Sequence, residues 1–422
     1  MNWWARFRGA PAAPAAAAPD SETLLRAGYD CASRGDRAEA ERNFRRIPEH
    51  DPAHADACFF LGRIAVADGR EEEAIALLQK AVESRPREAI YLHALGGVLM
   101  RAKRYEEALA AFRPGVALLP DSFALRNDYA AALIDANRRE EARVELEKLL
   151  EILPDAFTVH FNLGGIHREY GRPDEAIACY RRALELGTGN ALQSGPGDAW
   201  IYGNLLLQLN YSASLDAAAI FADHRRFGER FARRYELPVA DAAWPRRLRI
   251  GYLSPDFHQH VVVRFIEPVL ACHDRIRFEI FCYYNDREKD TVTERLRKLA
   301  VHWRDCEELS PTELARSIRA DRIDILVDLA GHTARNGLLT MALKPAPVQA
   351  TYLGYPNTTG LTAVDYRISD AYADPPGESD RLSAEQLLRL PGSYFCYRPE
   401  PLAPPVGPLP AQQAGYVTFG CF

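Results

Sequence analysis

The chain has 422 residues, of which 47% are hydrophobic and 26% charged, and its formal net charge is −6 at pH 7. This length exceeds one ordinary hydrophobic core, so we expect two or three structural units. No apolar run approaches the ~20 residues of a membrane helix. No block of Lys and Arg supplies the clustered positive charge that phosphate binding needs. These features exclude a membrane protein and argue against nucleic acid as the main partner.

Residues 1–20 form an Ala/Pro-rich leader that lacks the apolar core of a secretory signal. The eight cysteines are scattered, with no CxxC pair and no short spacing typical of disulfide frameworks. We therefore expect a disordered leader, reduced thiols and a cytoplasmic protein.

A repeat of 34 residues follows the leader. Prolines recur at this spacing, which is the period of tetratricopeptide helix pairs, at Pro52, Pro86, Pro120 and Pro154. Small residues share two further positions of the repeat, where the paired helices must approach closely. They are Gly28, Gly62, Gly96 and Gly164 at one position, and Ala40, Ala74, Ala108, Ala142 and Ala176 at the other. The pattern predicts an α-helical solenoid of five tetratricopeptide repeats over residues 21–190, with a concave face that holds protein or peptide partners.

Residues 191–245 are predicted to form a helical connector. The pattern of apolar residues changes after residue 245. Short apolar runs alternate with amphipathic stretches at 248–253, 278–284, 323–330, 348–353 and 364–368. Strands that alternate with helices indicate a parallel sheet with right-handed crossovers. The sequence therefore predicts a Rossmann-like α/β lobe over residues 246–414.

Ligands of such sheets bind beyond the carboxyl ends of the strands, so the segments after the apolar runs are candidate sites. The first run is followed by Asp256, His258 and His260, and a later one by His332. Asp256 could equally be a helix cap and His332 a turn histidine. No carboxylate or cysteine follows either of the two neighbouring histidines at the helical i+4 spacing to complete a metal site, so we predict no metal.

Other catalytic fingerprints are missing from the sequence. It has no GxGxxG dinucleotide motif, no P-loop and no GxSxG elbow. Hydride transfer, phosphoryl transfer from ATP and serine hydrolysis therefore lose support.

The strings RIGYLSPDFHQH, DILVDLAGHTARN, PAPVQATYLGYPNTTGL, VDYRISDAYADPPGE and LLRLPGSYFCY follow the repeats in this order. Together they resemble the SPINDLY / protein O-GlcNAc transferase family. The resemblance implies a GT-B glycosyltransferase, in which two Rossmann-like lobes face each other and a nucleotide sugar lies mainly on the second. It also implies an inverting, metal-independent transfer without a cofactor, to Ser or Thr hydroxyls of proteins threaded along the repeats.

By the same resemblance, Asp256 and His260 lie at the active site, beside the sugar and the acceptor. Gly354, Tyr355 and Pro356 match the loop that lines the sugar pocket, and we add His332 to this pocket. The attacking hydroxyl must lose its proton as the new bond forms, and either Asp256 or His260 could accept it.

Residues 415–422 match the start of the second lobe, so the resemblance implies that the chain is a fragment that is inactive alone; the alternative is a naturally truncated relative without activity of its own. N-acetylglucosamine from UDP-GlcNAc is the expected donor group, with fucose from GDP-fucose as the alternative. A non-catalytic tetratricopeptide scaffold is the alternative from a different class.

Overall fold

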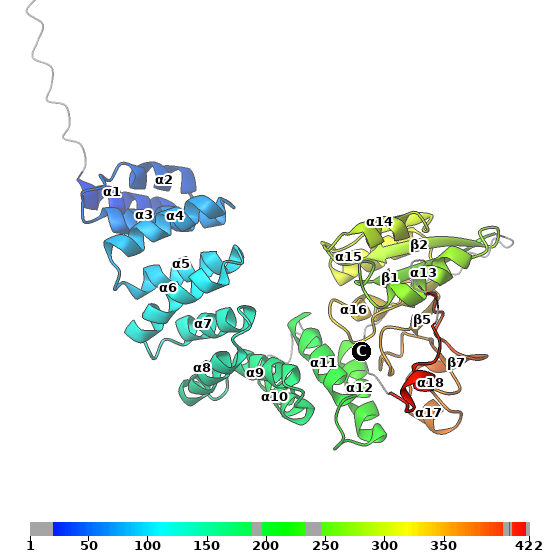
Figure 1. The fold of residues 1–422 in the computed structure, drawn as a ribbon. Coiled ribbons are helices and arrows are strands. Elements are labelled where there is room, and N and C mark those ends of the chain that lie inside the picture. The colour runs from blue at the N-terminus through cyan, green and yellow to red at the C-terminus, as the bar shows by residue number, and fades with distance from the viewer. Residues whose placement is uncertain (1–19, 188–195, 233–245, 400–404, 406, 419–422) are drawn as a thin grey trace, which may run out of the picture. The chain divides into compact units, whose positions relative to one another are not determined.

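The computed structural model describes residues 20–187, 196–232, 246–399, 405 and 407–418. Most of the predicted leader and the last four residues lie outside the described residues. The chain divides into two compact units, residues 1–169 and residues 170–422 (Figure 1). The division falls between the two helices of the predicted fifth repeat, and each unit is described by itself below.

The first unit is built from helical hairpins. Its helices are α1 (Ser21–Ser33), α2 (Arg37–Arg45), α3 (His54–Ala67), α4 (Glu71–Ser84), α5 (Ala89–Arg101), α6 (Tyr105–Leu118), α7 (Phe123–Asp135), α8 (Arg139–Ile152) and α9 (Phe157–Glu169). Asp20 and Asp36 cap the first two helices by accepting hydrogen bonds from backbone N–H groups of Thr23 and Glu39. The turn inside each hairpin contains one left-handed residue, at Gly35, Gly69, Lys103 and Asn137.

The small residues of the repeat lie where the two helices of a hairpin meet. An added Cβ at Gly28, Gly62 or Gly96 would stand 2.5–2.7 Å from the ring or side chain of Phe44, Leu78 or Phe112 on the second helix of the same hairpin. The repeat alanines Ala40, Ala74, Ala108, Ala142 and Ala176 are all completely buried. Successive first helices α1, α3, α5 and α7 also contact one another, so they line the inner side of the stack.

The second unit contains the remaining helices and one sheet. The helices are α10 (Pro173–Gly187), α11 (Pro196–Leu209), α12 (Ala217–Phe231), α13 (Val263–Cys272), α14 (Thr291–Arg297), α15 (Pro311–Ala320), α16 (Leu338–Met341), α17 (Glu378–Arg381) and α18 (Pro410–Ala414). The strands are β1 (Leu248–Ser254), β2 (Phe278–Tyr284), β3 (His302–Asp305), β4 (Ile325–Asp328), β5 (Val348–Tyr352), β6 (Tyr366–Asp370) and β7 (Gln386–Leu390).

All strands pair in parallel, in the order β3-β2-β1-β4-β5-β6-β7. The predicted fold class, a tetratricopeptide solenoid followed by a Rossmann-like α/β lobe, is confirmed. The prediction of five strands was incomplete, because β3 and β7 were missed. β3 has the short, polar sequence HWRD, which carries no apolar run, and the exposed residues of β7 alternate with a buried leucine.

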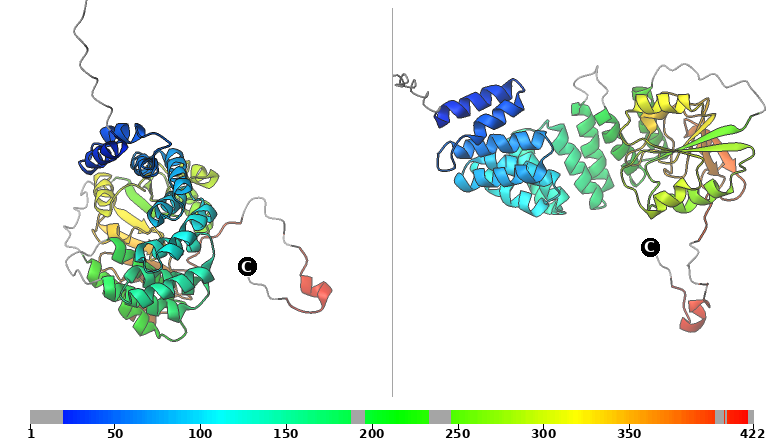
Figure 2. Two further views of the ribbon diagram at one scale, coloured as in Figure 1. Left: turned by 90° about the vertical axis from the view of Figure 1, so that its left-hand side faces the viewer. Right: turned by 90° about the horizontal axis from the view of Figure 1, so that it is seen from above.

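Helices cover both faces of the sheet (Figure 2). On one face, Val263, Ile266 and Leu270 of α13 and Val292 and Leu296 of α14 join the buried side chains of the central strands in a single cluster. Because side chains alternate between the faces of a strand, the intervening residues of β1 and β2 point to the opposite face, where α15 and α16 lie. Both faces of the sheet are therefore covered, which leaves the loops at its edges as the places for a site.

The connector helices α11 and α12 pack against loops at the carboxyl edge of the sheet. The approach is close enough that an added Cβ at Gly228 would lie 1.8 Å from the carbonyl oxygen of Gly360, whose φ is +76°. Both positions need glycine, because a side chain at Gly228 or at Gly360 would meet backbone atoms of the opposite segment. The connector is thus fixed on the loop that follows β5.

Candidate functional site

The order of the strands defines a switch point between β1 and β4. From these two neighbours the chain proceeds outward in opposite directions, to β2 and β3 on one side and to β5, β6 and β7 on the other. Crevices at such points, beyond the carboxyl ends of the strands, are where open α/β sheets bind ligands. Asp256 follows β1 by two residues, and Asp328 is the last residue of β4, so both carboxyl groups lie at this crevice.

The structure brings Asp256 and His260 together. Nδ1 of His260 lies 3.8 Å from Oδ1 of Asp256, and the side chains are 39% and 15% exposed. The backbone N–H of Asp256 donates to Oγ of Ser254, which fixes the turn out of β1 at 3.0 Å. The histidine is open to solvent while the carboxylate stays largely enclosed, so the pair can reach a ligand from one side only.

Burial raises the pKa of Asp256 above its ordinary value, and the neighbouring carboxylate of Asp286 adds to this effect. His260 and His258 act in the opposite direction, because a positive charge on either ring favours the ionised carboxylate. A carboxylate with a raised pKa is a better proton acceptor than an exposed one. The geometry therefore suits Asp256 to a proton-transfer role, with His260 beside it.

His258 lies close to this pair, and its Nδ1 atom lies near the carboxylate of Glu288. Its Nδ1 is 3.8 Å from a carboxylate oxygen of Glu288, and its ring centroid is 5.8 Å from that of His260. Its side chain is largely enclosed. This placement agrees with a supporting position rather than with direct contact to a ligand.

Asp328 is a residue of the crevice that sequence reasoning missed. It is fully buried, and its carboxylate accepts hydrogen bonds from the backbone N–H of Gly331 at 2.8 Å and from Oγ1 of Thr351 at 2.9 Å. Burial raises the pKa of Asp328 to about 6, and the charge of Asp256 contributes in the same direction. Asp328 therefore fixes the loop after β4 and adds a second titratable carboxyl group behind Asp256.

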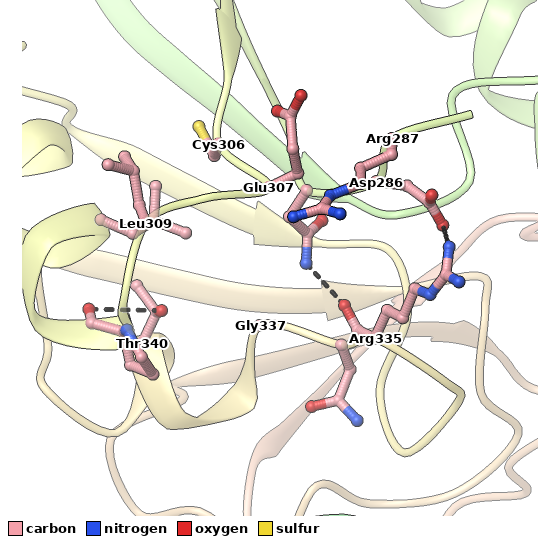
Figure 3. Close-up of a pocket in the computed structure, with 12 residues that line it drawn as sticks. Asp286, Arg287, Cys306, Glu307, Leu309, Arg335, Gly337 and Thr340 are labelled. Carbon is pink, nitrogen blue, oxygen red and sulfur yellow. Dashed lines mark hydrogen bonds and ion pairs between the residues drawn. The ribbon is translucent and has the colours of Figure 1, made fainter. Parts of the chain in front are cut away.

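Two pockets flank the crevice. One, of about 550 Å³, extends from His260 along the first turns of α13 and α14. The other, of about 460 Å³, lies beyond the ends of β2 and β3 (Figure 3). Figure 3 shows Asp286 and Arg335 paired at its rim and Leu309 and Thr340 on its opposite wall. The open part of the carboxyl edge is thus the part formed by β1, β2 and β3.

The predicted sugar-pocket residues lie on the other part of this edge. The hydroxyl of Tyr355 donates to the carbonyl oxygen of Leu206 at 2.9 Å and lies 2.8 Å from both Nε2 of His224 and Nδ2 of Asn210. His332 is buried against Phe227 of α12, with ring centroids 4.6 Å apart, and its Nε2 lies 2.8 Å from the carbonyl oxygen of Thr359. The polar groups of Tyr355 and His332 are therefore directed into the protein.

Gly354 and Pro356 flank the same contact. An added Cβ at Gly354 would lie 1.9 Å from the carbonyl oxygen of Leu329, so glycine is needed where the loops after β4 and β5 cross. Pro356 is exposed, and its carbonyl oxygen accepts a hydrogen bond from Arg367. The two pockets described above are lined by other residues. The assignment of Gly354, Tyr355, Pro356 and His332 to a sugar pocket stays a prediction.

Hydroxyl groups of the GYPNTTG loop also donate hydrogen bonds within the protein. Oγ1 of Thr358 donates to the buried carboxylate of Glu385 at 2.6 Å, and the backbone N–H of Thr359 donates to the same carboxylate at 2.7 Å. Oγ1 of Thr359 donates to this carboxylate as well, so Glu385, just before β7, engages the hydroxyls of both threonines.

The described residues contain no group of three or more His, Cys, Asp or Glu side chains placed to hold a metal ion. Across the same residues, the structure has no helix with both the length and the apolar character that crossing a membrane requires.

Comparison with known proteins identifies both units. Residues 230–399 match the model of glycosyl transferase family 41. Models of the tetratricopeptide repeat match residues 32–96, 99–160 and 157–187. Together with the fold, these matches define a tetratricopeptide-repeat protein that carries a glycosyltransferase-type lobe.

Relatives of this chain include the probable UDP-N-acetylglucosamine–peptide N-acetylglucosaminyltransferases SPINDLY of Solanum lycopersicum and Arabidopsis thaliana. Each is 44% identical to this chain, over 226 and 230 residues, which make up 52% of this chain and 24% and 25% of the relatives. A solved structure of a mutant Thermobaculum terrenum O-GlcNAc transferase is 31% identical, with a TM-score of 0.58, and the match covers 86% of this chain and 62% of that one. The chain is therefore a relative of the SPINDLY and O-GlcNAc transferase family, and its match spans about a quarter of the length of the SPINDLY proteins.

Proposed function

We propose that this chain supplies the repeats and the acceptor-side lobe of a protein glycosyltransferase. The reaction transfers N-acetylglucosamine from UDP-GlcNAc to Ser or Thr hydroxyls of proteins held by the repeats. The observation that carries the proposal is the Asp256–His260 pair, which stands at the switch point of the sheet within the region that matches glycosyl transferase family 41.

The chemistry of this pair supports the reaction. An inverting transfer needs a group that accepts the proton of the attacking hydroxyl while a single displacement takes place at the sugar carbon. Asp256 has a raised pKa and lies largely enclosed, and His260 faces the adjoining pocket. We assign proton acceptance to this pair, with Asp256 as the acceptor and His260 positioning the hydroxyl.

The first unit supports the choice of a protein as the acceptor. Its stacked hairpins present an inner surface formed by α1, α3, α5 and α7, and such surfaces hold extended peptides in other repeat proteins. A small-molecule acceptor would leave this surface without a role.

The test uses the protein as its gene encodes it, incubated with a peptide array and with either labelled UDP-GlcNAc or labelled GDP-fucose. Transfer from UDP-GlcNAc to Ser or Thr supports the proposal, and transfer only from GDP-fucose supports the alternative donor. No transfer from either, with peptides still bound, supports a non-catalytic scaffold.

Variants locate the chemistry. Asp256→Asn and His260→Ala should each lower kcat by about 10²–10⁴-fold with little change in donor affinity, since loss of a positioned proton acceptor has effects of this size. His258→Ala is the matched control and should stay near wild type. A silent His260→Ala beside a damaging His258→Ala would require the site to be reassigned.

A further inference from the structure

The lining of the pocket beside His260 has more positively charged than negatively charged side chains. Three of its lining residues are arginines, Arg264, Arg295 and Arg398, and one is a glutamate, Glu267. The guanidinium of Arg295 forms two hydrogen bonds with the carboxylate of Glu267, at 2.7 and 2.8 Å, so these two charges cancel. The remaining two guanidinium groups belong to Arg264 and Arg398.

Neither remaining arginine is neutralised by a carboxylate in the described part of the chain. Both are exposed, and the contact of Arg398 is with Sγ of Cys272 at 3.8 Å. The neighbouring carboxylate of Asp290 is already occupied, because it caps α14 and accepts the backbone N–H of Gln259 at 2.7 Å. Among the described residues, the pocket therefore carries two positive charges that a ligand can use.

The walls between these charges are apolar. Val261, Val263, Pro268, Val292 and Pro399 line the same cavity, whose volume is about 550 Å³. A free inorganic anion would leave this apolar surface uncovered. A peptide segment with a carboxylate and an apolar neighbour would cover both kinds of surface, since Arg binds carboxylates through two parallel hydrogen bonds.

We propose that this pocket selects acceptor polypeptides with an acidic residue close to the modified Ser or Thr. The inference rests on the proposed function, because the pocket is next to the reacting hydroxyl only if His260 faces it. Arg264 and Arg398 bind the acidic side chain, and the valine and proline walls contact the residue beside it. They are specificity residues and take no part in proton transfer.

The experiment measures peptide binding and needs no turnover. Fluorescence anisotropy is recorded for the full chain with Ser-containing peptides in which Glu or its neutral isostere Gln stands at each of five positions on either side of the serine. In the wild-type chain, at least one Glu peptide should bind about tenfold more tightly than its Gln counterpart, and the ratio should fall as salt is raised.

The double variant Arg264→Gln/Arg398→Gln should bring this ratio to about one. Arg316→Gln, an exposed arginine on α15 outside the pocket, should leave the ratio unchanged. Both changes replace exposed side chains, and equal melting temperatures would verify that the fold is intact. Uridine diphosphate serves as a second probe, because the phosphates of a donor offer the same kind of anion.

Three results would overturn the inference: no Glu peptide binds better than its Gln form, the preference survives the double variant, or the double variant loses uridine diphosphate instead. Failure of the proposed function is a separate result. Glycosyl transfer without an acidic preference rejects only the inference. An arginine-dependent preference without transfer from any donor rejects the enzyme and leaves the pocket as a binding site for acidic peptides.

Discussion

Adjacent glycines in helix α5 provide a test of the packing inside the repeats. Gly96 and Gly97 occupy the same helix, and substitution by Ala improves intrinsic helix propensity equally at both, by roughly 0.5–1 kcal/mol. Their surroundings differ. An added Cβ at Gly96 would lie 2.5 Å from Cε1 and 2.6 Å from Cζ of Phe112, whereas at Gly97 it would meet no atom within 4 Å.

The magnitudes follow from these distances. Carbon atoms in contact prefer about 3.5–4.0 Å, so the Phe112 ring would have to move by roughly 1 Å. That ring is completely buried in a close-packed hairpin, and overpacking of this kind costs about 1–3 kcal/mol. After the gain in helix propensity, Gly96→Ala should destabilise the first unit by roughly 1–2 kcal/mol. Gly97→Ala should stabilise it by roughly 0.5–1 kcal/mol.

Urea unfolding followed by circular dichroism, together with hydrogen exchange in α5 and α6, measures this difference. Exchange is the more direct observable, because repeat arrays can unfold in parts. Protection should decrease in Gly96→Ala and increase slightly in Gly97→Ala. If the two variants shifted stability in the same direction, the assigned contact between Gly96 and Phe112 would be wrong.

Three further changes test the rest of the structure. Gly228→Ala should release α12 from the lobe, since its Cβ would stand 1.8 Å from a backbone oxygen, and hydrogen exchange should then rise in α12 while β2 stays protected. Lys103→Gly should stabilise the first unit by roughly 0.5–1 kcal/mol in urea unfolding, because Lys103 has φ +58° where equivalent turns have glycine. Burial, with a smaller contribution from the charge of His224, holds the pKa of His332 well below 6.5, so the folded protein keeps this ring neutral while the unfolded chain protonates it. This ring should therefore make stability fall by about 1.4 kcal/mol for each pH unit below 6.5 until the folded pKa is reached. His332→Gln should make the slope shallower by this amount, while His224, whose pKa burial also lowers, keeps its own contribution; an unchanged slope would contradict the burial of the ring.

The architecture was predictable because its signals are local and repeated. Small residues spaced by 34 positions indicate helix hairpins, and the apolar runs at 248–253 and 278–284 are buried strands. β3 was not predictable by the same means. Its four residues are mostly half-buried and polar, and it is held by pairing with β2, which is a contact between segments distant in sequence.

The candidate site was only partly predictable. Asp256 and His260 come directly after an apolar strand, so their place at the carboxyl edge followed from chain order. Asp328 lies inside the apolar string ILVD and looks like one strand residue among others. Asp328 could have been found as a carboxylate at the end of a strand that lies next to β1. That inference needs the order of the strands in the sheet, which the sequence alone does not give.

The division of the carboxyl edge bears on His332 and Tyr355, whose assignment to a sugar pocket stays a prediction. Both do follow strands, but α11 and α12 cover the loops after β4 and β5, and the polar groups of the two side chains are turned toward these helices. A sequence does not reveal which half of an edge a connector will cover. Gly228 and Gly360 mark the contact between the connector and this half of the edge, but this is visible only in the structure, where the two glycines face each other. Because this half is closed by contacts at backbone distance, the two pockets described above lie on the other half of the edge, which also carries Asp256 and His260.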